Sequence, residues 1–234
     1  MKWAIELLGE DFDLEDARTL FASGTVRTET IEGNTTVLVA DDFESLIDSF
    51  QVREGAKSLI DLINGVLFLH DAARSPVRIG SVRENRDGNW SSHAVLEADS
   101  LVLRTKIGTP TLVLNGVAAA PKPPPERKWF QDAISDDVIA DVLTYLRAKP
   151  DWFELYKAFE RMRDDINRRS GGQHQLDTMG WPNKTELNYF TKSATVHRHS
   201  PPKWGRLNPT TAMKLDDARS FVRRLAQIWL DWRV

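Results

Sequence analysis

The sequence predicts an α+β protein in two parts: a ferredoxin-like split β-α-β module with extra antiparallel strands, followed by an all-α helical bundle. Three observations lead to this fold class. Over residues 1–117, short β-branched runs alternate with stretches of helical spacing, whereas over 129–234 the apolar residues recur only at helical spacing. Between them, residues 118–128 are rich in proline, which neither a helix interior nor a central strand tolerates. We therefore expect two modules joined by a linker.

The first module is expected to follow the order strand, helix, strand, strand, helix, strand. Asn64-Gly65 either ends the second helix or weakens its middle, and the unbroken apolar spacing favours continuation to His70. The stretch 86–89, Arg-Asp-Gly-Asn, is the strongest hairpin signal in the chain. The expected elements are strands at 3–8, 26–31, 35–40, 77–84, 90–97, 101–107 and 111–117, and helices at 13–21 and 52–70.

Four helices are expected in the second module, and their short connections favour an antiparallel bundle. Pro150 ends the first helix, Asp151 caps the second, and the glycine pair 171–172 ends the second. The third helix is expected at 184–196, and the last helix carries an apolar stripe over 218–232.

Composition and missing motifs exclude several classes of function. The chain has no cysteine, which excludes disulfides, thiolate nucleophiles, Cys-ligated zinc and iron–sulfur clusters. Its five histidines show no metal-ligand spacing, and P-loop, dinucleotide and α/β-hydrolase motifs are missing, so we expect no metal or cofactor. The chain shows neither the apolar core of a signal peptide nor a run of ~20 apolar residues, so we expect a cytoplasmic protein without a membrane partner.

Charge is divided unequally along the chain. Residues 1–120 carry 19 acidic and 11 basic side chains, a net charge of −8. Residues 121–234 carry 15 acidic and 20 basic side chains, a net charge of +5. The second part could therefore meet a polyanion such as RNA, or it could dock on the first part.

The densest candidate for a binding site is 197–199, His-Arg-His, at the end of the third bundle helix and next to a loop that carries proline and tryptophan. Tryptophans in loops with proline and glycine are harder to explain as core, so they and the neighbouring cations predict a contact surface for a protein or for RNA. The alternative is a solvated helix end whose cations suit the helix dipole. The predicted binding residues are Trp181, His197, Arg198, His199, Lys203, Trp204 and Arg206.

A second candidate site lies at the end of the second bundle helix. Arg168, Arg169 and His174 form the spacings Arg-x4-His and Arg-x5-His, which resemble the motif of HEPN domains. These all-helical modules often act as metal-independent ribonucleases of bacterial defence and toxin systems, generally with a second copy across a homodimer interface. The resemblance implies His174 as general acid or base and an arginine that holds the developing phosphate charge. Similar spacing at Arg86 and His93 is expected by chance.

A further resemblance covers 152–160 (WFELYKAFE) and 213–222 (MKLDDARSFV), which look like uncharacterised bacterial proteins of two-module build. It implies a bacterial source and no catalytic residue. Asp164 and Asp165 lie on a helix face beside Arg161 and Arg168 and are expected to form surface ion pairs rather than a catalytic site. Since no convergent catalytic set stands out, the sequence favours a binding or regulatory protein acting through a protein or RNA partner. The alternative is a HEPN-like ribonuclease within 129–234, so the sequence leaves open whether the protein is an enzyme.

Overall fold

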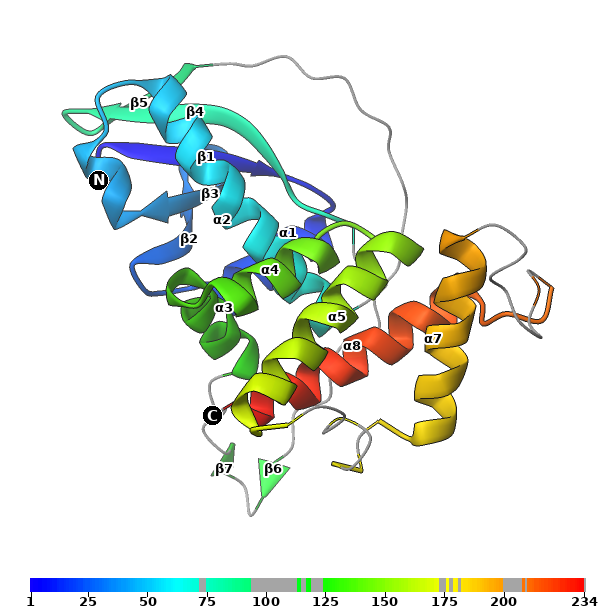
Figure 1. Cartoon of the computed structure of the whole chain (residues 1–234). Helices are drawn as coiled ribbons and strands as arrows, with labels where there is room; N and C mark the ends of the chain where they lie inside the picture. Colours follow the sequence, from blue (N-terminus) through cyan, green and yellow to red (C-terminus); the bar gives the residue numbers. More distant parts are fainter. Residues whose placement is uncertain are drawn as a thin grey trace. The chain divides into compact units, whose positions relative to one another are not determined.

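The computed structural model describes residues 1–71, 75–93, 113–114, 117–118, 124–172, 176, 179–180, 182–199, 208 and 210–233 (Figure 1). Two compact units divide the chain. One comprises Met1–Lys57 with Val77–Lys128, and the other comprises Ser58–Pro76 with Trp129–Val234. Helix α2 (Ser49–His70) contributes its first part to one unit and its second part to the other. The module boundaries expected from the sequence stay a prediction.

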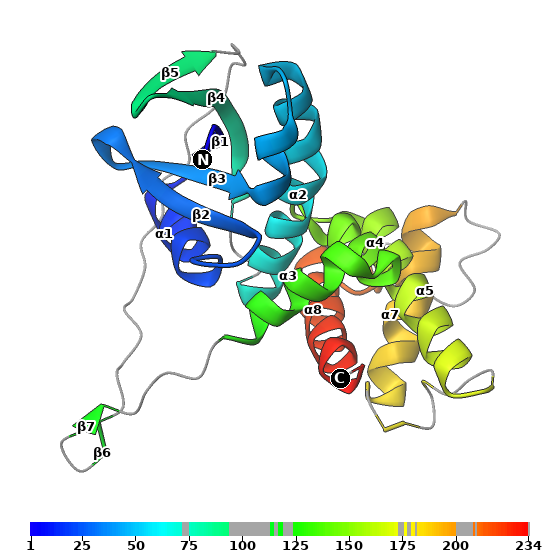
Figure 2. The same cartoon turned by 90° about the vertical axis from the view of Figure 1, so that its left-hand side faces the viewer.

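A five-stranded antiparallel sheet forms the first unit, in the order β2-β3-β1-β4-β5 (Figures 1 and 2). Helix α1 connects β1 to β2, and α2 connects β3 to β4, so the two β-α-β connections interleave and β1 lies between β3 and β4. This is the predicted ferredoxin-like arrangement, with β5 added at one edge. The elements are β1 (Trp3–Leu8), α1 (Asp11–Leu20), β2 (Val26–Ile31), β3 (Thr35–Ala40), β4 (Arg78–Arg86) and β5 (Asn89–His93).

The centre of this sheet is buried on both faces. Ile5 pairs with Leu38 and both are fully buried on one face, where the Thr28 hydroxyl donates to the Ala17 carbonyl of α1 at 3.1 Å. The opposite face carries a smaller apolar cluster, formed by Ala4, Val37 and Val39 with the partly buried Ile31 and Trp90. Burial on both faces explains why β1 and β3 read as nearly continuous apolar runs rather than strict alternation.

Helices build the second unit. Asp136 caps α4 by accepting hydrogen bonds from the backbone N–H groups of Val138 and Ile139, and Asp151 with Glu154 forms a capping box at the start of α5. The largest fully buried side chains include Trp229, Phe190 and Phe221, and helix α5 packs against α4, α7 and α8. The helices are α3 (Pro125–Ser135), which belongs to this unit from Trp129 onward, α4 (Asp137–Leu146), α5 (Trp152–Arg169), α7 (Lys184–Arg198) and α8 (Leu215–Trp232).

Gly65 shows why α2 needs a glycine in its middle. A Cβ atom there would lie 2.3 Å from the carbonyl oxygen of Leu143 in α4, far inside van der Waals contact. The helices therefore approach each other at a point where only hydrogen fits. The helix runs through Gly65 to His70, as the apolar spacing predicted.

Three local features differ from the sequence-based expectation. The segment 111–117 was expected as one strand, but β6 (Val113–Leu114) pairs with β7 (Val117–Ala118) in a two-stranded antiparallel ladder. The sequence between them is Asn-Gly, a typical hairpin dipeptide that the strand prediction overlooked. Helix α3 is additional to the four helices expected in the second module: it begins at Pro125, inside the expected linker, because proline is well tolerated in the first helical turn. The β4–β5 turn tightens to Asp87-Gly88, both at positive φ, so β4 extends to Arg86.

The strand expected at 101–107 lies outside the described residues. Within the part of the chain that the structure describes, no helix has both the length and the apolar composition needed to cross a membrane.

Candidate functional site

The first residues of α5 and the last turn of α7 form an aromatic surface that includes two of the predicted binding residues. Helix α7 runs beside α5 in both views (Figures 1 and 2). The His197 ring stacks on Trp152, with centroids 4.5 Å apart and planes inclined by 11°. One turn further along α5, the Arg198 guanidinium lies 3.9 Å from the centroid of the Tyr156 ring. Two consecutive residues of α7 therefore rest on two aromatic rings of α5.

Helical periodicity explains this arrangement. Trp152 and Tyr156 are four residues apart, so they lie one above the other on α5. Both stack near Phe190 of α7, at centroid distances of 6.0 and 6.5 Å, and Phe190 belongs to the buried core. The surface rings are thus continuous with the core, which holds them in fixed orientations.

A second pair on α5 widens the surface. Phe153 is 54% exposed, and the Lys157 ammonium lies 5.8 Å from the centroid of its ring. The same ammonium donates to the Glu160 carboxylate at 3.1 Å. We call the group formed by Trp152, Phe153, Tyr156, Lys157, His197 and Arg198 the aromatic–cation face.

Electrostatics differ among the three basic side chains of this face. Partial burial against Trp152 lowers the pKa of His197, so its imidazole is neutral at pH 7 and presents a flat, uncharged ring. Lys157 and Arg198 supply the positive charge. Arg198 forms no ion pair with a carboxylate among the described residues. Its guanidinium makes a cation–π contact with the Tyr156 ring.

Arg168 and Arg169 have a different environment. Both donate to the carboxylate of Asp165, at 2.8 and 3.1 Å. The sequence predicted a surface ion pair, but the Asp165 side chain is only 1% exposed and also accepts a hydrogen bond from the Trp229 indole of α8 at 3.1 Å. The ion pair between Asp165 and Arg168 was predicted correctly. The burial of Asp165 was not, because it depends on α8, which lies far away in the sequence.

Asp165 links three helix ends through a buried charge network. Burial by itself raises the pKa of Asp165, but the hydrogen bonds from Arg168, Trp229 and Arg169 and the charge of Arg233 outweigh it, so the pKa is lowered. Arg233 is nearly buried, lies 3.6 Å from Asp165 and pairs with Asp136, the cap of α4. The network therefore joins the ends of α4, α5 and α8.

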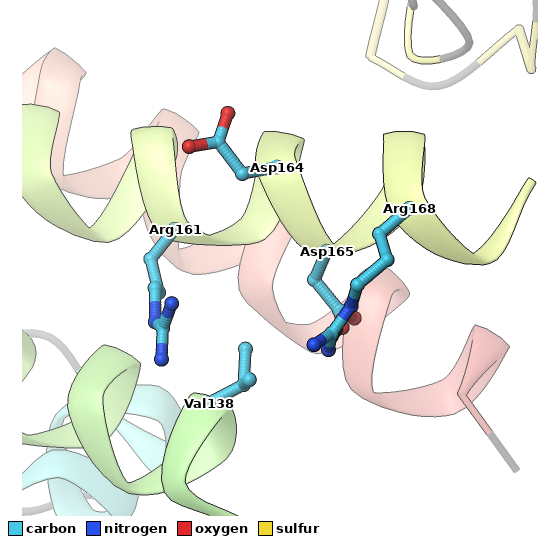
Figure 3. A pocket seen from close by; sticks show the side chains of 5 residues that line it. All are labelled: Val138, Arg161, Asp164, Asp165 and Arg168. Atoms are coloured by element: carbon cyan, nitrogen blue, oxygen red, sulfur yellow. Dashed lines mark hydrogen bonds and ion pairs between the residues drawn. The ribbon is translucent and has the colours of Figure 1, made fainter. Parts of the chain in front are cut away.

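A small recess of about 110 Å³ opens beside this network between α4 and α5 (Figure 3). The side chains of Arg161 and Arg168 point toward α4 on either side of Val138, whereas Asp164 points away. Both arginines that line the recess are paired with carboxylates, Arg168 with Asp165 and Arg161 with Asp141, at 2.8 Å in each pair. The balanced charge gives this recess little attraction for an anion.

The β4–β5 hairpin carries another buried carboxylate with basic partners. The buried Glu84 accepts from Arg86 at 2.9 Å and lies 3.2 Å from Nε2 of His93, whose ring centroid is 5.9 Å from that of Trp3. The hydrogen bond from Arg86 lowers the pKa of Glu84. Arg86 and His93, whose motif-like spacing is expected by chance, therefore both contact the carboxylate of Glu84. No set of three or more His, Asp or Glu side chains is placed to hold a metal ion within the described ranges.

Several predicted site residues lie outside the described residues: His174, Trp181, Lys203, Trp204 and Arg206. The proposed approach of His174 to Arg168 or Arg169 stays a prediction. His199 follows the end of α7 and is exposed. From the sequence, Trp152 and Phe153 were not predicted as site residues. The signal that could have found them is that these aromatic residues lie outside the apolar stripe of Leu155 and Phe159, which forms the core.

No protein family, functionally described protein or solved structure matches the chain. The resemblances to HEPN domains and to bacterial proteins of two-module build therefore stay predictions.

Proposed function

We propose that the protein binds single-stranded RNA on the aromatic–cation face. The observation that carries this proposal is the placement of flat rings and cations on one surface: His197 on Trp152, Arg198 on Tyr156, and Lys157 beside the exposed Phe153. Unpaired bases stack on such rings, and each stacked base contributes about 1–3 kcal/mol. The accompanying cations are suited to the phosphates between bases.

Phe153 and His197 are the rings available to a ligand. Trp152 and Tyr156 each have one face taken up by α7, whereas Phe153 is 54% exposed and His197 is also an exposed residue. A neutral imidazole can stack on a base and also donate or accept one hydrogen bond. Lys157 and Arg198 would then contact phosphate oxygens, and the planar guanidinium of Arg198 could bind two of them at once.

The basic character of the surrounding sequence supports the same ligand. Residues 157–206 contain 10 basic and 5 acidic side chains. Because much of that charge is offset by ion pairs such as Arg168–Asp165 and Lys157–Glu160, the attraction is modest and the aromatic contacts must provide much of the affinity. We therefore expect the affinity for RNA to depend only weakly on salt concentration, as it would for about two phosphate contacts.

Fluorescence anisotropy with a labelled single-stranded RNA of about 12 nucleotides tests this proposal. Replacing Phe153 with alanine should raise Kd about 5- to 150-fold, which corresponds to the loss of one stacked base. Arg198→Gln should raise Kd and also reduce its dependence on salt. Phe50→Ala is the control, because Phe50 is an even more exposed phenylalanine, at 70%, in the other unit. Equal affinity of Phe153→Ala and wild type would refute the proposed site.

The ribonuclease interpretation makes a separate prediction. It requires His174, which the structure does not describe, to act together with Arg168 or Arg169. Both arginines donate to the buried Asp165, so part of their hydrogen-bonding capacity is already used. Cleavage of the same RNA by wild type, and its loss in His174→Ala with binding retained, would favour the ribonuclease; intact RNA after prolonged incubation would favour binding alone.

A further inference from the structure

Two large apolar side chains are exposed where α2 begins. Ile47 is 76% and Phe50 70% exposed, and no other large apolar side chain in the described part of the chain is as exposed. Asp48, between them, caps the helix by accepting from the backbone N–H of Gln51 at 2.8 Å. Val52, on the other side of the helix, is fully buried. The local fold therefore directs Ile47 and Phe50 outward.

Three carboxylates lie close to these two side chains in the sequence, and one of them, Glu44, is 3.5 Å from the N-terminal ammonium. Asp42, Glu44 and Asp48 are all exposed within six residues of Ile47 or Phe50. The wider segment 1–57 carries 13 acidic and 5 basic side chains. We call the group of Ile47, Phe50, Asp42, Glu44 and Asp48 the apolar–acidic patch.

The chemistry of this patch restricts what can cover it. RNA and anionic lipid surfaces are repelled by its carboxylates. Two such patches would repel each other as well, which disfavours a symmetric contact of the patch with itself. A suitable partner must offer exposed apolar surface together with positive charge.

The aromatic–cation face has both properties. Phe153 is 54% exposed, and Lys157 and Arg198 provide positive charge beside it. We infer that a second copy of this chain docks its aromatic–cation face on the apolar–acidic patch. Phe153 would pack against Phe50 and Ile47, with Lys157 and Arg198 facing the carboxylates. The inference uses the face but does not depend on RNA binding.

Such a contact joins two different surfaces, so it is heterologous, and each copy retains one free patch and one free face. Association can then continue beyond two copies at high concentration. Because the patch contains only two large apolar side chains, the interface falls below the usual size of stable complexes and the association should be weak. Screening of the opposite charges should weaken it further in high salt.

Sedimentation velocity of the full chain, without RNA, tests the inference. Wild type should sediment faster as its concentration rises, and less so in high salt. Phe50→Ala and Phe153→Ala should each weaken self-association about tenfold or more, whereas Ile134→Ala, at an exposed apolar residue outside both surfaces, should not. All three substitutions are at exposed positions, and thermal melts would confirm that the variants remain folded.

Mixing the two variants gives the sharpest test. Phe153→Ala retains an intact patch and Phe50→Ala retains an intact face, so an equimolar mixture should regain association but stop at two chains. A mixture that stays monomeric overturns the inference, as does a wild-type sedimentation coefficient independent of concentration or a Phe50→Ala variant that associates like wild type. Failure here would leave the RNA-binding proposal untouched, because sedimentation without RNA and anisotropy with labelled RNA measure different interactions.

Discussion

Replacing Gly65 with alanine tests the packing of the helical unit. Alanine is favoured over glycine in a helix interior by about 1 kcal/mol, so helix propensity alone predicts stabilisation. The structure predicts the opposite. The new Cβ would lie 2.3, 2.7 and 2.8 Å from the oxygen, carbon and Cα of Leu143, and relieving the shortest contact requires α2 and α4 to separate by about 1 Å. Overpacking of this kind costs about 1–3 kcal/mol, and backbone atoms cannot rotate away as a side chain can.

The clash with backbone places the overpacking cost at the upper end of this range, about 3 kcal/mol, and the gain in helix propensity offsets about 1 kcal/mol of it. We therefore expect a net loss of about 2 kcal/mol in the free energy of unfolding, or about 4–8 °C in Tm for a chain of this size. Gly55→Ala is the matched control on the same helix, because its Cβ would lie 3.7 Å from Phe43, an ordinary contact. That variant should be stabilised by about 0.5–1 kcal/mol. Urea unfolding followed by circular dichroism measures both. A Gly65→Ala variant as stable as Gly55→Ala would refute the close approach of α2 and α4.

Three further predictions concern charge and backbone conformation. Asp165→Asn should destabilise the protein by about 1–3 kcal/mol in urea unfolding, because it removes the buried charge that accepts from Arg168 and Arg169, while Arg233 retains its pair with Asp136. The lowered pKa of Asp165 contributes stability that is present above the unfolded-state pKa of about 3.9 and is lost as the pH falls through the folded-state pKa. The free energy of unfolding of the Asn variant should therefore fall less steeply at acid pH than that of wild type, and equal slopes would contradict this. RNA binding should tighten as the pH falls from about 7 to 5, because His197 gains a proton, and with it a positive charge, only below its lowered pKa. His197→Phe keeps a flat ring and should abolish that pH dependence without abolishing binding. Gly88→Ala should lower the stability by about 1 kcal/mol, because Gly88 has a φ of 86° in the β4–β5 turn; thermal melting measures it, and an unchanged Tm would argue against this turn.

Much of the first unit follows from local sequence signals. The β-branched runs, the helical spacings between them and the Asp87-Gly88 turn were sufficient to predict the interleaved sheet. The apolar spacing of 111–117 predicts a single strand, whereas the Asn-Gly dipeptide within it turns the chain and β6 pairs with β7. Long-range pairing decides such short segments, and local spacing does not record it.

The candidate site shows the same limit. The density of cations at the end of α7 indicated His197 and Arg198, but their aromatic partners lie on α5, more than 40 residues earlier. Nothing in either segment specifies which neighbour a helix end will meet. Likewise, Arg168 and Arg169 gave a motif-like spacing, and only the approach of Trp229 from α8 shows that their shared carboxylate, Asp165, is buried. Residue types could be predicted, whereas their tertiary partners could not.

The most direct test of RNA binding at this face is photocrosslinking. Wild-type protein would be irradiated with single-stranded RNA containing 4-thiouridine, and the modified peptides would be identified by mass spectrometry. We expect crosslinks at Phe153 and His197 that disappear when unlabelled RNA is added in excess. Crosslinks confined to the sheet of the first unit, or none on α5 and α7 at low salt, would contradict the account.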